Sequence, residues 1–124
     1  MAERKWRILL VDDDASMLKV YGKWFELAGY DVLKASSGAE ALAKVAEQPP
    51  DLIVLDVEMP GLNGYEVCSK LKENRAMSEI PVVLFTAKGE PQEMPGFPNV
   101  YVGKSCQAKP LLEQVKAILT SRPT

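Results

Sequence analysis

Three aspartates of the chain stand directly after short apolar runs. Asp12 and Asp13 follow the run Arg7–Val11, and Asp56 follows the run Leu52–Leu55. Neighbouring carboxylates repel one another, because two unit charges about 4 Å apart cost roughly 4 kcal/mol at an effective dielectric of about 20. A divalent cation removes this cost, and Mg²⁺ favours carboxylate oxygens together with waters and a substrate phosphate. If the fold gathers the three aspartates, they predict a Mg²⁺ site.

Two further polar residues end apolar runs in the second half of the chain. Thr86 follows residues 81–85, and Lys104 follows residues 100–102 after one glycine. The Lys ammonium can neutralise a phosphoryl oxygen as a point charge, and the Thr hydroxyl can donate to another. A carboxylate that stays ionised beside a metal can act as a nucleophile. The set therefore predicts phosphoryl transfer to a carboxylate, catalysed by positioning and charge neutralisation.

Taken singly, each of these side chains has a simpler explanation. An aspartate after a strand is a common helix cap or turn residue, Thr86 could be a turn residue, and Lys104 could be a solvated charge. The functional interpretation depends on all five polar residues falling at the ends of four predicted strands. In a parallel sheet these ends share one edge, and ligands of such sheets bind outside the carboxyl ends of the strands.

The elements that must position these residues alternate along the chain. Continuous apolar runs are typical of strands buried on both faces. Asp14 is a predicted N-cap, Gly29 a predicted C′ residue, and Ser37 with Glu40 a predicted capping box. Strands separated by crossover helices predict a parallel sheet covered on both faces. The predicted strands are residues 7–11, 31–35, 52–55, 81–85 and 100–102. The first and third predicted helices are residues 15–28 and 64–73, and the second begins behind Ser37 and stops before Pro49. The last predicted helix has Pro110 at position N1.

One crossover departs from this pattern. Between Thr86 and Val100 the chain contains Pro91, Pro95 and Pro98 together with two glycines. Proline removes a backbone donor and glycine disfavours helix, so a regular fourth helix is not expected there. We predict a loop with at most one helical turn over residues 88–99, which covers the sheet rather than forming a docking surface.

Composition excludes several function classes. With 124 residues, a single domain spanning residues 1–124 is expected, and the formal net charge of −2 disfavours direct binding of nucleic acid. No histidine is present, so neither a histidine-dependent triad nor a Cys/His zinc site is possible. The two cysteines form no disulfide framework, which favours a reducing cytoplasm. Neither a signal peptide nor an apolar run of the roughly 20 residues that span a membrane is expected.

The sequence resembles the receiver domain of two-component response regulators over nearly its whole length. The fold this resemblance implies is a doubly wound, five-stranded parallel α/β sheet of flavodoxin-like order 2-1-3-4-5, with helices on both faces and the fourth helix degenerate or missing. The segment Pro50–Gly64 is the most specific and matches the phosphoacceptor segment of the family almost throughout. The other matching stretches are Ile8–Asp14, Gly29–Val32, Ser37–Leu42, Pro81–Ala87 and Tyr101–Lys104.

The resemblance implies a role for each candidate residue. Asp56 would accept a phosphoryl group from a phosphohistidine of a sensor histidine kinase or a phosphotransfer protein, forming an aspartyl phosphate. Asp12, Asp13, Asp56 and the backbone carbonyl of Glu58 would hold Mg²⁺. The Glu58 side chain would also affect the lifetime of the phosphoryl group, in a direction that the sequence leaves open.

Three more residues receive roles from the resemblance. Thr86 and Lys104 would contact the phosphoryl oxygens, and Tyr101 would be the switch aromatic whose rotamer follows Thr86. Lys109-Pro110 also matches the Lys-Pro pair of the family. Lys104 is preferred because it directly follows the last strand and lies three residues after Tyr101, and because using Lys109 would shorten the last helix.

Two departures from the family pattern change what is expected. Ser105 stands where the family usually has a proline, and a non-proline cis bond costs about 2.5–4 kcal/mol, so we predict a trans Lys104–Ser105 bond. The altered crossover at residues 88–99 belongs to the face by which the family usually signals. The usual mode of dimerisation and the usual partner are therefore not expected to carry over unchanged.

Three other functions compete with a phosphorylation switch. A receiver-like interaction module that works without phosphorylation would keep the fold. Asp12-Asp13-Asp14 is also similar to the D-x-D motif of haloacid dehalogenase-like phosphatases, but Ser16 departs from that motif and the chain is short for a cap domain. A P-loop is excluded, since Pro98 stands where that motif needs a glycine before Gly103.

The function we expect is therefore a receiver in the bacterial cytoplasm. It would switch a surface that binds a downstream target protein, with no direct contact to nucleic acid and no membrane insertion. It would be no enzyme beyond catalysing its own phosphoryl acceptance and autodephosphorylation. It would act alone or as an excised part of a longer protein.

Overall fold

Strands and helices alternate along the described chain, except that its last two strands follow one another with no described helix between them. The computed structural model describes residues 5–56, 59, 61–86, 100–103 and 108–121, of which residues 85, 86, 100–103, 108–110 and 121 are described by their backbone only. The elements are β1 (Arg7–Val11), α1 (Ala15–Leu27), β2 (Asp31–Ala35), α2 (Gly38–Glu47), β3 (Leu52–Asp56), α3 (Gly64–Glu73), β4 (Val82–Thr86), β5 (Val100–Gly103) and α4 (Ala108–Ser121).

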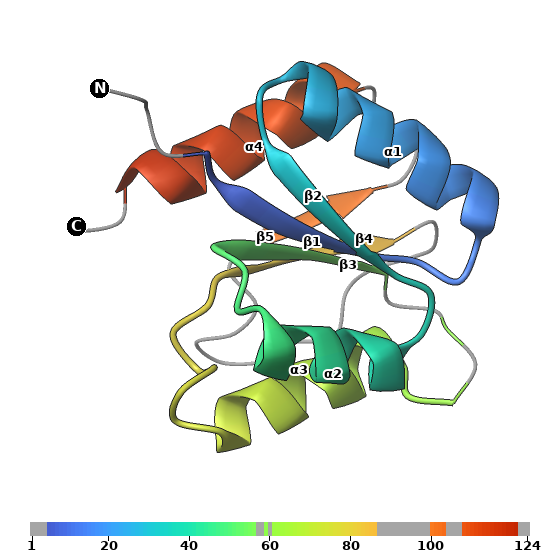
Figure 1. The fold of residues 1–124 in the computed structure, drawn as a ribbon, viewed down its shortest axis with the longest axis vertical. Coiled ribbons are helices and arrows are strands. Elements are labelled where there is room, and N and C mark those ends of the chain that lie inside the picture. The colour runs from blue at the N-terminus through green and yellow to red at the C-terminus, as the bar shows by residue number, and fades with distance from the viewer. Residues whose placement is uncertain (1–4, 57–58, 60, 87–99, 104–107, 122–124) are drawn as a thin grey trace.

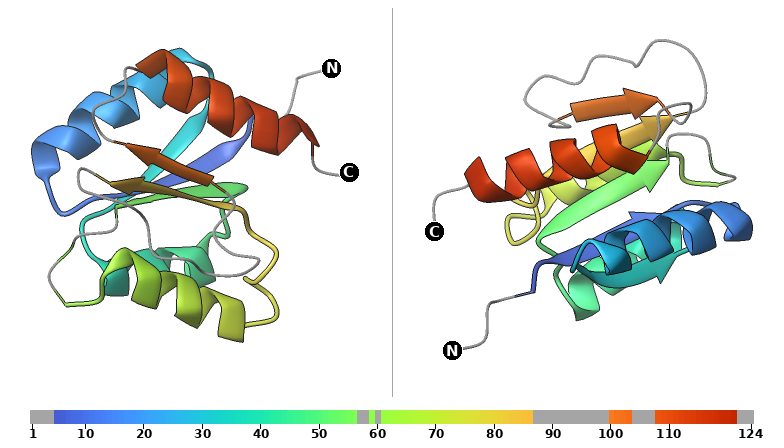
Figure 2. Two further views of the ribbon diagram at one scale, coloured as in Figure 1. Left: turned by 180° about the vertical axis from the view of Figure 1, so that it is seen from behind. Right: turned by 90° about the horizontal axis from the view of Figure 1, so that it is seen from above.

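The strands form one parallel sheet with the order β2-β1-β3-β4-β5. Helices α1 and α4 cover one face of it, and α2 and α3 cover the other (Figures 1 and 2). The predicted α/β fold, the strand order 2-1-3-4 and the helices on both faces are thereby confirmed. The predicted degenerate or missing helix falls within residues 87–99, which lie outside the described residues.

Burial on both faces explains why the strands are apolar throughout. Side chains alternate between the two faces of a strand, and each face of this sheet packs against helices. In β1, Leu9 and Val11 belong to the core beneath α2 and α3, whereas Ile8 and Leu10 belong to the core beneath α1 and α4. Each of these four side chains is at most 1% exposed, so the sheet is fixed in register from both sides.

Within the described residues, three helices begin at a side-chain cap, and two of these caps were predicted. Asp14 caps α1, and Ser37 caps α2 by accepting the Glu40 N–H at 3.1 Å. The predicted Ser37/Glu40 box is only half right, because the Glu40 carboxylate accepts from the N–H of Ser36 instead of that of Ser37. A complete capping box instead begins α3, where Asn63 and Glu66 each accept the other's backbone N–H, at 2.9 and 3.0 Å.

The end of α1 agrees with the prediction, whereas the start of α4 differs from it. Helix α1 ends at Leu27, and Gly29 has the left-handed φ of 98° that suits a C′ glycine. The last helix begins at Ala108, so Pro110 is its third residue and not its first. Proline is tolerated there because the amides of the first turn have no partner within the helix. Among the described helices, none has the length and apolarity to cross a bilayer.

Candidate functional site

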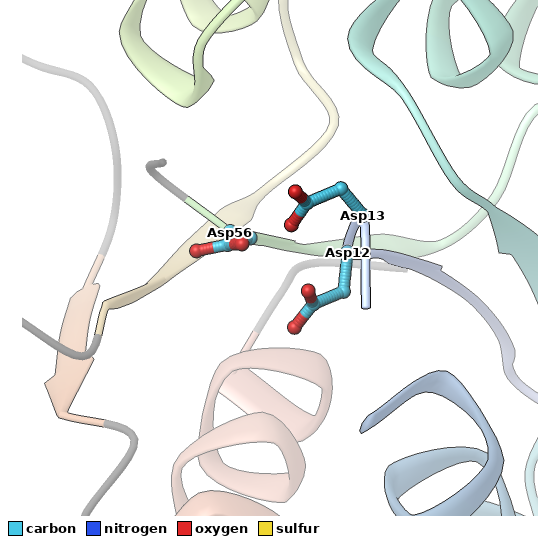
Figure 3. Close-up of side chains that lie close together, drawn as sticks. All are labelled: Asp12, Asp13 and Asp56. Atoms are coloured by element: carbon cyan, nitrogen blue, oxygen red, sulfur yellow. The ribbon is translucent and has the colours of Figure 1, made fainter. Parts of the chain in front are cut away.

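The three predicted aspartates converge at the carboxyl edge of the sheet. Strand β1 lies beside β3 with Val11 opposite Leu55, so Asp12 and Asp56 emerge next to each other. One carboxylate oxygen from each of Asp12, Asp13 and Asp56 lies within 4.8 Å of the others. Figure 3 shows the side chains of Asp12 and Asp13 leaving the chain on opposite sides, with Asp56 beside them. The parallel topology therefore brings together residues more than forty positions apart.

Burial differs among the three carboxylates. Asp12 is 1% exposed and Asp56 is 3% exposed, whereas Asp13 is exposed. A buried carboxylate loses hydration, and this loss is tolerated where the charge is paired or binds a metal. The cluster is thus anchored inside the protein and open to solvent through Asp13, as a site that takes up a ligand from water must be.

A short hydrogen-bonded turn fixes Asp12 relative to helix α1. The backbone N–H of Asp14 donates to Asp12 Oδ1 at 3.0 Å. Asp14 in turn uses its own Oδ1 to accept the N–H of Ser16 at 2.9 Å and the Ser16 hydroxyl at 2.6 Å. The start of α1 and the orientation of the Asp12 carboxylate are therefore set together. This turn was not predicted from the sequence, although an aspartate such as Asp12 that accepts the N–H two residues later is a common turn motif.

The donor set of this cluster fits a hard divalent cation. Three carboxylates whose oxygens lie within 4.8 Å repel one another by roughly 3 kcal/mol per pair at an effective dielectric of about 20. Oxygen ligands of this kind suit Mg²⁺, which keeps waters and binds through a few carboxylates rather than a closed protein cage. The arrangement can therefore hold a metal and leave room for an anionic group beside it.

The remaining predicted site residues are described in part or not at all. Thr86 is the last residue of β4, opposite Gly103 of β5, and Tyr101 is opposite Leu84. The backbone of Thr86 thus reaches the same edge as Asp56. The side chains of Thr86 and Tyr101, and all of Glu58, Lys104 and Ser105, lie outside what the structure describes. Their roles stay predictions, as does the trans Lys104–Ser105 bond.

Comparisons with known proteins define the class. The sequence model of the family described as the response regulator receiver domain matches residues 8–116, and the chain belongs to that family. A CheY-like receiver domain protein from Methanospirillum hungatei superposes with a TM-score of 0.88 at 26% identity, over 95% of this chain and 96% of that one. CheY4 of Vibrio cholerae gives 0.84 at 26% identity, over 93% and 99%.

Curated relatives include longer regulators. The alkaline phosphatase synthesis transcriptional regulatory protein PhoP of Bacillus subtilis is 46% identical over 84 residues, which are 68% of this chain and 34% of that protein. The DNA-binding regulator RpaA of Synechocystis is 35% identical over 117 residues, 91% of this chain and 48% of that protein. The chain therefore spans between a third and a half of these relatives.

A cysteine on the inner side of α3 gives the fold a pH dependence. Cys68 is fully buried, and burial raises the pKa of its thiol from the usual 9.0 to about 12. The folded protein therefore keeps a proton that the unfolded chain loses above the usual pKa. The stabilisation from the neutral thiol is complete below about pH 9 and is lost as pH rises towards 12.

This cysteine supports a prediction about alkaline stability. Between about pH 8 and about pH 10, the free energy of unfolding is expected to fall by about 1.4 kcal/mol more in the native sequence than in Cys68→Ala. Urea unfolding of both proteins at the two pH values measures this difference. Equal pH dependence in the two proteins would show that the thiol is ionised as readily in the folded state as in the unfolded chain.

Proposed function

We propose that this chain is a phosphorylation-controlled signalling receiver whose phosphoacceptor is Asp56. The observation that supports this function best is the convergence of three carboxylates at one sheet edge in a member of the receiver family. Of the three, Asp56 ends the central strand β3, which lies beside β4, and β4 carries Thr86 as its last residue. A nucleophile in that position would have the proposed metal ligands Asp12 and Asp13 on the β1 side and the proposed phosphoryl-binding residue Thr86 on the β4 side.

The reaction transfers a phosphoryl group between two side chains. A carboxylate oxygen of Asp56 attacks the phosphorus of a phosphohistidine on a sensor histidine kinase or phosphotransfer protein. The new P–O bond forms as the P–N bond breaks, and the electron pair of that bond returns to the imidazole nitrogen. Hydrolysis of the aspartyl phosphate later restores the carboxylate. Beyond catalysing its own phosphoryl acceptance and this hydrolysis, the protein would not act as an enzyme.

The residues around Asp56 supply positioning and charge. Asp12, Asp13, Asp56 and the Glu58 carbonyl would hold Mg²⁺, which when bound neutralises charge on the phosphoryl oxygens. The Thr86 hydroxyl and the Lys104 ammonium would contact the remaining oxygens. Asp14 holds the Asp12 carboxylate through its backbone N–H, 3.0 Å away, and so keeps one ligand in place before phosphorylation.

Phosphorylation would switch a protein-binding surface. An added phosphoryl group brings about −1.5 to −2 charges and draws hydrogen-bond donors toward itself. Thr86 would move inward, and Tyr101, which lies on the neighbouring strand β5, would change rotamer with it. The surface reached by this movement would bind a downstream target protein in the bacterial cytoplasm. The receiver itself, with its net charge of −2, would neither bind nucleic acid nor insert into a membrane.

Labelling by a small phosphodonor tests the proposal directly. The chain is incubated with radiolabelled acetyl phosphate in Mg²⁺ or in EDTA, and the product is reduced with borohydride, which converts an aspartyl phosphate to homoserine. We expect Mg²⁺-dependent labelling and homoserine at position 56. Absence of labelling, with the fold intact, would instead favour an interaction module that works without phosphorylation.

A further inference from the structure

The first turn of helix α1 is held by its cap more than by packing. Ala15 and Ser16 are exposed, and Met17 is half-buried. The first buried residue of the helix is Leu18, its fourth. The carboxylate of Asp14 holds this turn instead, because its Oδ1 accepts the N–H of Ser16 at 2.9 Å, the N–H of Met17 at 3.4 Å and the Ser16 hydroxyl at 2.6 Å. These bonds close the turn that leads from β1 into α1.

Asp14 also holds Asp12 through its backbone. Its N–H donates to Asp12 Oδ1 at 3.0 Å, and its carbonyl oxygen accepts the N–H of Leu18 at 3.1 Å. The backbone of Asp14 is extended, with a φ of −91° and a ψ of 110°, as is typical of an N-cap. The direction of its N–H depends on this conformation, which the bonds of its carboxylate to the first turn stabilise. The cap of α1 and the hydrogen bond to Asp12 are therefore coupled.

Asp12 has to be held against the repulsion of its neighbours. Its side chain is 1% exposed, and one of its oxygens lies within 4.8 Å of oxygens of Asp13 and Asp56 (Figure 3). Without a cation, this repulsion favours rotation of the Asp12 carboxylate away from the other two, and the bond from the Asp14 N–H opposes that rotation. Groups that orient a metal ligand without touching the metal change the affinity for the metal by about 10–100-fold.

We propose that Asp14 is a positioning residue, whose capping carboxylate sets the affinity of the cluster of Asp12, Asp13 and Asp56 for Mg²⁺ and couples the ion to the first turn of α1. This inference rests on the proposed function, in which the cluster holds Mg²⁺, and adds a residue that determines how tightly. Such a coupling is reciprocal, so if the cap strengthens the binding of Mg²⁺, bound Mg²⁺ stabilises the cap by the same factor. The first turn of α1 therefore responds to the ion.

Two substitutions of Asp14 separate its cap from its charge. Asp14→Asn keeps a side-chain oxygen that accepts the N–H groups of the first turn, whereas Asp14→Ala removes the acceptor. Both remove the same negative charge, so a difference between them comes from the cap. Ser37→Ala is the control for loss of a cap as such, because Ser37 caps α2 by accepting the N–H of Glu40 at 3.1 Å. That helix follows β2, whereas Asp12 and Asp13 follow β1.

Titration calorimetry with Mg²⁺ at constant ionic strength measures the dissociation constant of the ion. We expect Asp14→Ala to bind Mg²⁺ about tenfold more weakly than Asp14→Asn, and Ser37→Ala to bind it within about twofold of the native sequence. The second measurement is amide hydrogen exchange of the native sequence, followed by NMR. Saturating Mg²⁺ is expected to slow exchange of the Ser16 and Met17 N–H groups by about tenfold, and that of the Glu40 N–H by less than about twofold.

The outcomes separate this inference from the proposed function. Equal dissociation constants in Asp14→Asn and Asp14→Ala, or exchange at Ser16 and Met17 that does not change with Mg²⁺, would overturn the role of Asp14 alone. Weakening in Ser37→Ala as large as that in Asp14→Ala would also overturn it, because the effect would then come from a general loss of helix stability. If Asp14→Ala does not fold, the exchange measurement on the native sequence decides by itself. A native sequence that binds Mg²⁺ but is not labelled by acetyl phosphate would overturn the proposed function and leave this inference standing. A native sequence that binds no Mg²⁺ would overturn both.

Discussion

Replacement of Asp56 by asparagine is expected to reduce labelling by acetyl phosphate by on the order of 10²-fold or more, with the fold retained. A carboxylate oxygen carries the charge and the lone pair that attack phosphorus, whereas a neutral amide does not. Asp56 ends a strand whose other side chains are fully buried, and asparagine has the same shape, so the core is not disturbed. Labelling is measured as incorporated radioactivity per chain, and folding by near-ultraviolet circular dichroism.

Asp31→Asn is the matched control for this substitution. Asp31 is the first residue of β2, so it lies where the strands begin, whereas Asp56 lies where they end. Its side chain is 53% exposed, and its Oδ2 lies 3.8 Å from Nε of Arg7. An exposed ion pair of this kind contributes little to stability, so the variant makes the same chemical change away from the site. Labelling of Asp31→Asn should match that of the native sequence within about twofold.

Two results would assign the chemistry to another aspartate. Labelling that survives in Asp56→Asn would show that Asp12 or Asp13 accepts the phosphoryl group. Turnover of a small phosphate ester that survives in Asp56→Asn and is lost in Asp12→Asn would favour the phosphatase with which Asp12-Asp13-Asp14 shares a motif.

The elements could be predicted because their signals are local. Apolar runs such as Leu52–Leu55 require burial on both faces, and this requirement, together with the crossovers, leads to a parallel sheet. Once the sheet is parallel, Asp12 and Asp56 must share its carboxyl edge. The convergence of the aspartates was therefore predictable from residue order alone, whereas their burial depends on what packs around them.

Hydrogen bonds for which several neighbouring backbone groups could serve as the partner were predicted less well. Glu40 was expected to bond the N–H of Ser37, but its carboxylate reaches the N–H of Ser36, one residue earlier. The Asn63–Glu66 box went unrecognised within a segment rich in turn residues, although its spacing is that of a capping box. The close approach of Leu62 to Gly38 could not be predicted, because it depends on the packing of α2 and α3 against the sheet.

Magnesium is expected to reverse the order of stability of the native sequence and Asp12→Asn. Without a divalent cation, the variant should be more stable by about 1 kcal/mol, because it removes one of three mutually repelling carboxylates. Asparagine keeps an oxygen for the hydrogen bond from the Asp14 N–H, so the turn that this bond closes is preserved. The advantage is smaller than the full repulsion between a pair, since the exposed Asp13 lets solvent screen the cluster.

Saturation with Mg²⁺ should make the native sequence more stable than Asp12→Asn. A ligand present at 100 times its dissociation constant stabilises the native state by about 2.7 kcal/mol. If loss of one carboxylate weakens binding about 100-fold, the same concentration stabilises Asp12→Asn by only about 0.4 kcal/mol. The native sequence then becomes the more stable of the two. Urea unfolding in EDTA and in Mg²⁺, at equal ionic strength, measures both differences.

Asp31→Asn separates a bound ion from a general effect of salt. Its carboxylate lies at the other edge of the sheet, so its difference in stability from the native sequence should be the same in EDTA and in Mg²⁺. A shift in Asp31→Asn as large as that in Asp12→Asn would mean that Mg²⁺ screens surface charge and binds no cluster. Equal stabilisation of all three proteins would contradict the metal site, because the aspartates at the end of β1 and β3 would then hold no ion.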